Sequence, residues 1–488
     1  LRTALLAAPG GFQPDEPVWR TSPPRGDDGP TDGAWALPAE PYSSVARAVP
    51  GSALADRQVL QVGRSILRGK AQAVRPERIK KIKAFDTACE LVRVMRGFGR
   101  VPGRKIGGWL AAPQLGTPSR LIAFEDAAAE ALSDEERRQT GRQVPCGLKV
   151  IFNPFLRPAG KETVALWERS PSIPGYRALV ERPLAVHISG QDPEGREVDY
   201  VAEGWEARLA QQAADVIDGK FFIDRCVMRS LRHVDAQGDP LPPDCPPVGH
   251  FPAEPATQKS QEEILEEAER GGSRGFLAAL NPFGFGEPQA LLVGSLLLRV
   301  RSEEVPLEDI RSGRHAGVVD ELRRALATGK YPLGVAAPLF GHRLRVIGVG
   351  EMQEQVEKLS ANARVTEEHS EFGPLVLFNP VVRRAPKSPN AFFMENSPAI
   401  PGYEGVVGRA LEVDVEGVND KGDAVTLRTR GWRARMLQHA ADMLDGVLYV
   451  DRMERSSFRV DKIDEPLAEG VPVGIRAFSE KARRPKSG

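Results

Sequence analysis

The strongest constraint on the fold is that the second half of the chain repeats the first half at a nearly constant offset in residue number. The segment 151–176 is similar to 377–403, and both end in Ile-Pro-Gly-Tyr. A second pair of similar segments lies at 203–225 and 430–452. Four anchor pairs keep one and the same offset: Glu168 and Glu395, Gly204 and Gly431, Asp215 and Asp442, and Asp224 and Asp451. A period of nearly half the chain exceeds that of solenoid repeats, so it predicts two copies of one globular domain.

Length and composition agree with several globular domains. The chain has 488 residues, which is too long for one ordinary domain. Its 66 basic and 66 acidic residues balance, and this argues against a protein that binds nucleic acid through overall positive charge. No run of about 18 apolar residues is present, so we expect no membrane span. The four cysteines are scattered without a C-x-x-C pair, which fits a reducing compartment.

The histidines exclude a local helical metal motif. The chain has seven histidines, and no two of them are three or four residues apart. Two histidine ligands on one face of a helix need that spacing. The phosphate-binding pattern G-x-x-x-x-G-K-[ST] is also absent. Any metal would therefore need ligands from distant segments.

The repeat and the proline content predict the domain boundaries. We expect the two copies to occupy 59–232 and 290–460. Residues 1–58 are rich in proline and glycine and predict an extended arm. Residues 233–289 predict a proline-rich linker with a short charged helix, and 461–488 a C-terminal tail.

Each copy is predicted to have an α+β fold. An early helix is expected over 79–96 in the first copy and 318–327 in the second. A late helix in each copy starts at Gly-Trp and ends before Gly219 or Gly446, which we place at C-terminal caps. Short strands between these helices are expected at 148–152 and 375–378.

Six short motifs occur in the same order in both copies. They begin with V-G-x-x-x-L-R, at Val62 and Val293, followed by an Ala-Ala-Pro loop and an Asn-Pro pair. A Glu-x-Ser segment ending in Pro-Gly, the late helix, and an Asp-Arg pair complete the series. In this combination the chain resembles the peptide deformylase family over 59–230 and 290–455. The resemblance implies two tandem deformylase-like domains of α+β fold, joined by the proline-rich linker and preceded by the arm.

The catalytic residues of that family do not carry over. The resemblance implies a divalent metal held by one cysteine and two histidines, with a glutamate that moves protons. In the order cysteine, first histidine, glutamate and second histidine, these positions hold Ser170, Gln212, Ala213 and Val216 in the first copy, and Ser397, His439, Ala440 and Met443 in the second.

These replacements predict that the chemistry is lost. A catalytic metal site needs at least three suitable donors, but copy one keeps none and copy two keeps only His439. Without a metal no bound water is acidified, and alanine cannot act as a general base. We therefore expect no metal, no cofactor and no catalytic residue. We expect Val216 and Met443 to fill the vacated volume with apolar atoms.

Several residues keep alternative interpretations. His439 is interpreted as a core histidine, with an unusual metal site as the alternative. Ser170 and Ser397 are interpreted as structural, although each is in principle a nucleophile. Trp109 is interpreted as a plug in the former substrate loop, with a stacking platform for a ligand as the alternative.

The expected function is that of a non-catalytic scaffold subunit. Because deformylases act on nascent chains, the resemblance implies a translation-related assembly, in first place a mitochondrial ribosome or its assembly intermediate. The expected partners are ribosomal or assembly-factor proteins, and rRNA through the arm and the basic tail; by family analogy the location is the mitochondrial matrix. One alternative is a pseudo-enzyme that binds peptide N-termini in a residual groove. Another is a hydrolase with a rebuilt site.

Overall fold

The computed structural model describes most of the two repeated copies. The described residues are 58–98, 100–101, 104–105, 108–126, 132–133, 137, 142, 146–236, 241–242, 244–246, 248, 288–461 and 463–476. Their contacts form two compact units. Unit 1 takes in Ala71–Glu162 and Pro183–Ile217, and unit 2 takes in Val59–Lys70, Thr163–Arg182 and the chain from Asp218 onward. The arm predicted over 1–58 lies outside the described residues as far as residue 57, and so do the charged helix and the basic end of the tail.

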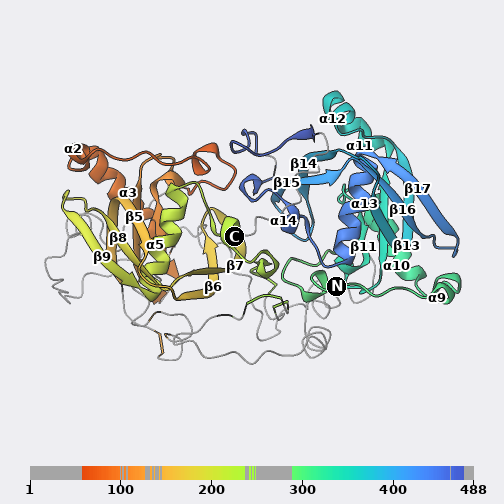
Figure 1. Cartoon of the computed structure of the whole chain (residues 1–488), viewed down its shortest axis with the longest axis horizontal. Coiled ribbons are helices and arrows are strands. Elements are labelled where there is room, and N and C mark those ends of the chain that lie inside the picture. The colour runs from red at the N-terminus through yellow and green to blue at the C-terminus, as the bar shows by residue number, and fades with distance from the viewer. Residues whose placement is uncertain are drawn as a thin grey trace, which may run out of the picture. The chain divides into compact units, whose positions relative to one another are not determined.

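Unit 1 is built around an antiparallel sheet with the strand order β3-β4-β5-β8-β9 (Figure 1). The five strands are Gly108–Ala111, Leu121–Asp126, Cys146–Pro158, Ala185–Gln191 and Glu197–Glu203. Helices α3 (Ile82–Phe98) and α5 (Gly204–Ile217) pack on β3 and β4. Four successive residues of β4, 121–124, are fully buried, so both faces of this strand are covered.

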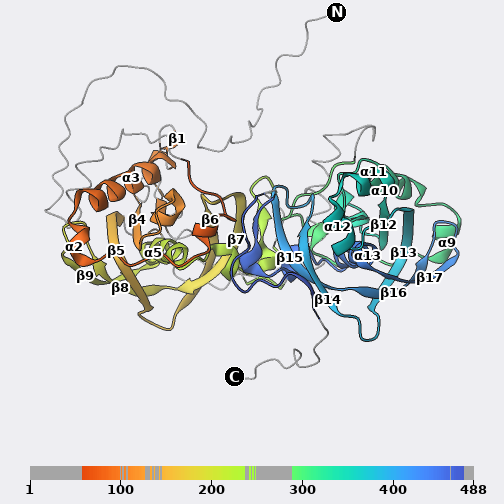
Figure 2. The same cartoon turned by 90° about the horizontal axis from the view of Figure 1, so that it is seen from above.

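Unit 2 contains a sheet of the same design, with the order β11-β12-β13-β16-β17 (Figure 2). Its strands are Val335–Ala336, Val346–Glu351, Phe372–Arg384, Glu412–Val418 and Ala424–Arg430. Helices α10 (Ala316–Ala327) and α13 (Gly431–Leu444) pack on β11 and β12. Short helices also belong to this part of the chain: α9 (Leu307–Arg311), α11 (Gln353–Lys358) and α12 (Ala361–Thr366).

Two smaller sheets also belong to unit 2. One has the order β18-β15-β14-β19, with the strands Arg459–Val460, Tyr403–Ala410, Asn390–Asn396 and Gly474–Arg476. The other has the order β10-β7-β6, with the strands Arg232–His233, Ile173–Pro183 and Thr163–Ser170. The first copy therefore contributes β6 and β7, as far as Arg182, to the same compact unit as the second copy.

The two large sheets repeat each other down to their irregularities. The register shifts between Phe124 and Asp126 on β4, and between Val349 and Glu351 on β12. A second shift follows residue 152 on β5 and residue 378 on β13. β-Bulges persist in related sheets because they bend the strand at a defined point. The shared order and shared bulges confirm the predicted duplication and the α+β class.

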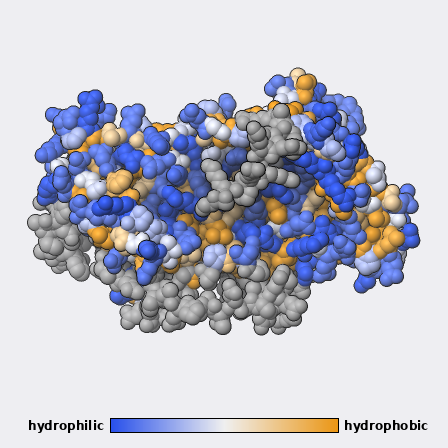
Figure 3. All heavy atoms as spheres, in the orientation of Figure 1, coloured by the Kyte–Doolittle hydropathy of each residue, from blue (hydrophilic) through white to orange (hydrophobic). Residues whose placement is uncertain are grey.

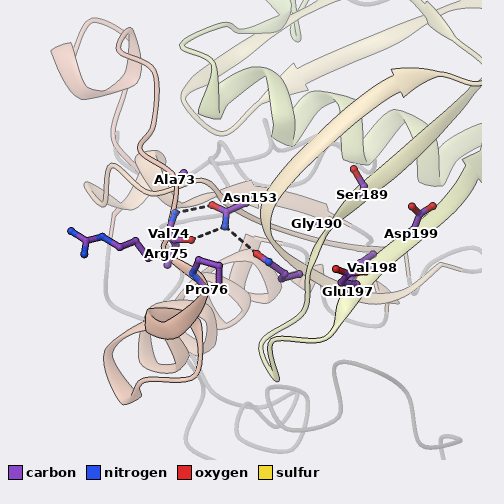
Figure 4. Close-up of a pocket in the computed structure, with 11 residues that line it drawn as sticks. Ala73, Val74, Arg75, Pro76, Asn153, Ser189, Gly190, Glu197, Val198 and Asp199 are labelled. Atoms are coloured by element: carbon purple, nitrogen blue, oxygen red, sulfur yellow. Dashed lines mark hydrogen bonds between the residues drawn. The ribbon is translucent and has the colours of Figure 1, made fainter.

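An asparagine clamp accompanies the second bulge in each sheet. Asn153 has a φ of 50°, and its Oδ1 accepts from the N–H of Val74 at 2.7 Å while its Nδ2 donates to the Val74 carbonyl at 2.7 Å (Figure 4). Asn379 has a φ of 47° and holds Val305 in the same way, at 2.9 and 2.8 Å. Asparagine tolerates the left-handed region and offers both a donor and an acceptor. The asparagine of the Asn-Pro motif therefore holds a residue in the early part of each copy, Val74 or Val305, against strand β5 or β13.

We expect Asn379→Ala to lower the free energy of unfolding by about 2–3 kcal/mol, because it leaves two backbone groups of Val305 without their partner and puts alanine at a positive φ. Urea unfolding followed by circular dichroism measures this loss. Asn379→Gly is the matched control, since it removes the same hydrogen bonds without the conformational cost. The clamp would be discounted if Asn379→Gly unfolded at the urea concentration of the unaltered protein.

The glycine caps predicted for the late helices are present. Gly219 has a φ of 74° and Gly446 a φ of 72°, in the left-handed region. A Cβ at Gly219 would lie 2.5 Å from the carbonyl oxygen of Arg68, and one at Gly446 would lie 2.5 Å from that of Arg299. Glycine is therefore required at both positions for conformation and for space.

The structure corrects some predicted boundaries. The helix expected from residue 79 begins at Ile82, because Pro76–Ile79 forms a separate short helix, α2. The strands expected at 148–152 and 375–378 are longer, as β5 and β13 show. Part of the predicted C-terminal tail forms β19, which pairs with β14.

On the face seen in Figure 3, hydrophobic residues are interspersed with hydrophilic ones, which is normal for a surface in water.

Candidate functional site

The candidate site lies in unit 2, where the end of β14 meets helix α13. Glu395 is the last residue but one of β14. Arg435 and His439 are four residues apart on α13, so their side chains leave the same face of the helix. Arg409 comes from β15, the strand paired with β14. All four side chains are buried.

Glu395 is the centre of a buried ionic cluster. Arg409 donates to both of its carboxylate oxygens, through Nε and Nη2, at 2.8 Å each. Arg435 donates to Glu395 Oε1 from Nη1 at 2.7 Å, and also to the carbonyl of Ala391 at 3.0 Å. His439 Nδ1 lies 3.0 Å from Glu395 Oε2. A carboxylate with this many charge-assisted partners binds helix α13 to the end of β14.

The partners keep Glu395 ionised. Burial alone would raise the pKa of this carboxyl, but the charge of Arg409 and its hydrogen bonds, together with His439 and Arg435, hold the pKa well below its usual range. Burial likewise opposes the charge of Arg409, and the neighbouring carboxylates of Glu395 and Asp442 keep the pKa of its guanidinium above the ordinary value. The Glu395–Arg409 pair is therefore charged throughout the physiological pH range.

Asp442 extends the ionic cluster along helix α13 toward the surface. Arg409 donates to Oδ2 of Asp442, and Arg452 donates to Oδ1 from Nη2 at 2.7 Å, while Nε of Arg452 lies 2.6 Å from Oδ2. Arg452 is half exposed, so this end of the cluster reaches the surface. Asp442 and Arg452 line a hollow of about 710 Å³ whose other walls include Arg301 and Arg345. The His439 end is buried, whereas the Asp442 end borders this hollow.

The first copy has the same acid and arginine in the same places. Glu168 on β6 accepts from Arg182 on β7, at 2.6 Å from Nε and 2.8 Å from Nη2. Both side chains are almost completely buried. Glu168 precedes Glu395, and Arg182 precedes Arg409, by the same repeat offset. The buried pair is therefore common to the repeated domain.

All eight positions that correspond to the family's site are buried. Ser170 ends β6 in copy one, Ser397 directly follows β14 in copy two, and the remaining positions lie on the late helices. In copy two, Ser397, His439, Ala440 and Met443 are no more than 4% exposed. Gln212, Ala213 and Val216 are buried on α5. Because His439 bonds to Glu395, two residues before Ser397, the structure brings the strand end and the helix face together in copy two.

The donors at these positions in copy two do not fit a catalytic metal. Ser397 Oγ accepts from the N–H of Ala399 at 3.3 Å, so it closes a local turn. His439 is the one nitrogen ligand of the set, and Met443 is an apolar residue with only a weak thioether donor. Across the described part of the chain, no group of three or more His, Cys, Asp and Glu residues could hold a metal ion.

At the other motif positions in the described part of the chain, the residues are buried or lie within a strand. Gln114 is fully buried, and its Oε1 accepts from the N–H of Ala111 at 2.9 Å. The equivalent position in copy two is the buried Leu339. Ala440 and Ala213 are fully buried and have no group that can move a proton. Trp109 is half-buried on β3, opposite Phe124 of β4.

Sequence reasoning missed the arginines that bind the central acid. Arg409 and Arg435 lie 14 and 40 residues from Glu395 in the chain, so no local motif joins them. Their signal was present in the repeat, because Arg182 and Arg208 precede them by the offset of the anchor pairs. A search for charged residues that recur at the repeat offset would have found both.

The fold and the site define a duplicated α+β domain of deformylase type. The model of the polypeptide deformylase family matches residues 56–232 and again 291–459. These two matches cover most of the chain. The chain therefore belongs to the peptide deformylase family, with its domain present in two tandem copies.

Similar proteins carry the same family name. "Peptide deformylase 1A, chloroplastic" of Solanum lycopersicum is 34% identical over 186 residues, which are 38% of this chain and 66% of that protein. "Peptide deformylase, mitochondrial" of Homo sapiens is 37% identical over 177 residues, 36% of this chain and 70% of its own. A solved peptide deformylase of Synechococcus elongatus in complex with actinonin is 30% identical, covers 36% of this chain and 85% of its own, and has a TM-score of 0.29. The chain thus spans about two thirds of the length of these curated relatives.

Within the described residues, none of the helices is both long enough and apolar enough to cross a membrane.

Proposed function

We propose that this protein is a non-catalytic member of the peptide deformylase family and serves as a scaffold subunit of a translation-related assembly. The observation that carries the proposal is the donor set of copy two. His439 is the one family ligand present there, and its Nδ1 is engaged by Glu395 within a saturated ionic cluster. The ionic cluster supports packing of α13 on β14, and the donor set offers neither a metal-bound water nor a general base.

The burial of the same positions favours a scaffold over a peptide binder. Ser397, His439 and Met443 would form the floor of a residual groove, but each is at most 4% exposed. A bound peptide N-terminus could reach them only if neighbouring side chains moved. The duplicated domain instead offers a large folded surface, and the buried ionic cluster around Glu395 stabilises the fold beneath it.

Translation in an organelle is the setting that the relatives support. The relatives from tomato and human are described as chloroplastic and mitochondrial. Removal of a formyl group is chemistry of nascent chains, so we propose the mitochondrial ribosome or its assembly intermediate as the assembly, with the mitochondrial matrix as the location. Ribosomal or assembly-factor proteins are the proposed partners.

The loss of catalysis is tested by metal content and turnover. Protein purified after exposure to Zn²⁺, Ni²⁺ or Fe²⁺ should retain well under one equivalent of metal per chain, because it lacks three suitable donors. It should release no formate from a formyl-methionyl peptide, whereas the human mitochondrial relative, assayed alongside, provides the positive control. Stoichiometric metal or measurable formate release would overturn the proposal in favour of a rebuilt hydrolase.

The scaffold role is tested by sedimentation from cells that express the protein. On a sucrose gradient at moderate salt, a tagged full-length chain should migrate with ribosomal particles or their precursors. Migration only at the top of the gradient would contradict the scaffold proposal. Crosslinking of formyl-methionyl peptides to the free protein would instead support the peptide-binding alternative.

A further inference from the structure

Within unit 2, segments of the first copy contact the second copy through residues that are equivalent in the two copies. The first-copy segments in this unit are Val59–Lys70, Thr163–Arg182 and the residues from Asp218 to the end of the first copy. Three kinds of contact between these segments and the second copy have a counterpart in which the roles of the copies are reversed. Such reciprocity is the signature of a self-complementary surface related to itself by a two-fold axis.

The tyrosines of the Pro-Gly-Tyr turns form the first reciprocal pair. Tyr176 donates its O–H to the carbonyl of Pro401 at 3.0 Å, and Tyr403 donates to the carbonyl of Pro174 at 3.4 Å. The two rings meet edge to face, with centroids 5.1 Å apart and an interplanar angle of 85°. Burial raises the pKa of both phenols, so the hydroxyls remain donors.

The arginines of the V-G-x-x-x-L-R motifs form the second pair. Arg68 pairs with Asp224 of its own copy at 2.7 Å and donates to the carbonyl of Arg455 in the other copy at 3.3 Å. Arg299 pairs with Asp451 of its own copy and donates to the carbonyl of Met228 in the other copy at 3.3 Å. Met228 and Arg455 occupy equivalent positions in the two copies, at the offset of the anchor pairs.

Backbone groups complete the set. The N–H of His233 donates to the Val293 carbonyl at 2.7 Å, and the N–H of Val460 donates to the Val62 carbonyl at 3.0 Å. Next to these bonds, a Cβ at Gly63 would lie 2.7 Å from Cβ of Arg459, and a Cβ at Gly294 would lie 2.5 Å from Cβ of Arg232. Both glycines have nearly the same positive φ, 112° and 113°.

We infer that this face is a two-fold docking surface of the repeated domain, and that its partner is the other copy in the same chain. One reciprocal contact could arise by chance. Here the hydrogen bonds of phenol, guanidinium and backbone groups each occur twice, with the roles of the two copies reversed. The turns that carry Tyr176 and Tyr403 follow Ser170 and Ser397 directly. In this protein they join the copies, and the single chain is a covalent equivalent of a symmetric dimer.

The surface is tested on the full-length protein cut between its copies. A protease site inserted between residues 251 and 287 of the predicted 233–289 linker allows the purified, folded chain to be nicked after folding. We expect the two pieces to elute together from a size-exclusion column at micromolar concentration and to retain the circular dichroism spectrum of the intact chain. Pieces that separate at this concentration would overturn the inference.

A tyrosine variant shows whether the reciprocal contacts provide the affinity. In nicked protein, Tyr176→Phe with Tyr403→Phe should raise the dissociation constant of the two pieces about 10- to 100-fold, because two buried hydrogen bonds are lost. Tyr331→Phe is the matched control, since its hydroxyl bonds to the Pro288 carbonyl, close to the start of the second copy. Equal dissociation constants for the double variant and the control would overturn the assignment of this face.

Discussion

Replacing Glu395 with alanine should lower the free energy of unfolding by about 3–5 kcal/mol, because it leaves the guanidinium groups of Arg409 and Arg435 buried without their shared counter-charge. This is a large part of the stability of an ordinary domain. Urea unfolding monitored by intrinsic fluorescence measures the change. The Asp414→Asn variant, which removes an exposed pair with Arg428, serves as the control and should unfold like the unaltered protein.

The pH dependence of this effect has a definite sign. The pKa of Glu395 is lower in the folded protein than in the unfolded chain, so its contribution is present above the unfolded value and disappears as the pH falls. The stability difference between the unaltered protein and Glu395→Gln should therefore be largest near neutral pH and shrink on acidification. A difference that stayed constant down to acidic pH, or a loss below about 1 kcal/mol at neutral pH, would show that the cluster is not what binds α13 to β14.

Restoring the family's donors to copy two should create a metal site there, whereas we expect the unaltered protein to bind no metal at this position. The variant Ser397→Cys with Ala440→Glu and Met443→His adds a thiolate, a carboxylate and a second imidazole around His439. His439 and position 443 are four residues apart on α13 and can hold one ion together. The bond from Nδ1 to Glu395 would orient the ring and leave Nε2 as the ligand atom. We expect about one equivalent of Zn²⁺ per chain, measured by elemental analysis after gel filtration.

The cost of the new glutamate can be separated from the effect of the ligands. Ala440 is fully buried, so a carboxylate there loses its solvation. The two-residue variant Ser397→Cys with Met443→His omits that cost and should also bind Zn²⁺, whereas Ser397→Cys alone should not. Equal Zn²⁺ contents in the unaltered protein and the three-residue variant would contradict the view that donor loss defines this site.

The duplication and the α+β class were predictable because they depend on patterns that run along the chain. Glycines at 219 and 446, apolar residues at helical spacing and the repeat at constant offset each have a local physical meaning. The family followed from short motifs in a fixed order, and the family model confirms it. Loss of catalysis, the scaffold role and the assembly remain predictions.

The ionic cluster was predictable only in part. Arg409 recurs in the first copy at the repeat offset, but this does not identify its partner, which is fixed only when β14 and β15 pair. The division into compact units was open for a related reason. The repeat predicted two copies of one domain, which the family model matches at 56–232 and 291–459, but it gave no sign that Thr163–Arg182 of the first copy shares a compact unit with the second. Long-range pairing of this kind is set by tertiary packing, which local patterns do not encode.

Strand β19 covers part of one edge of strand β14. It pairs with Asn390, Ala391 and Phe392 along the outer edge of β14. A chain that stopped before Gly474 would leave the amide and carbonyl groups of that edge open to other molecules. Exposed strand edges are templates for intermolecular β-pairing, so we expect such a shortened chain to self-associate more readily than the full chain.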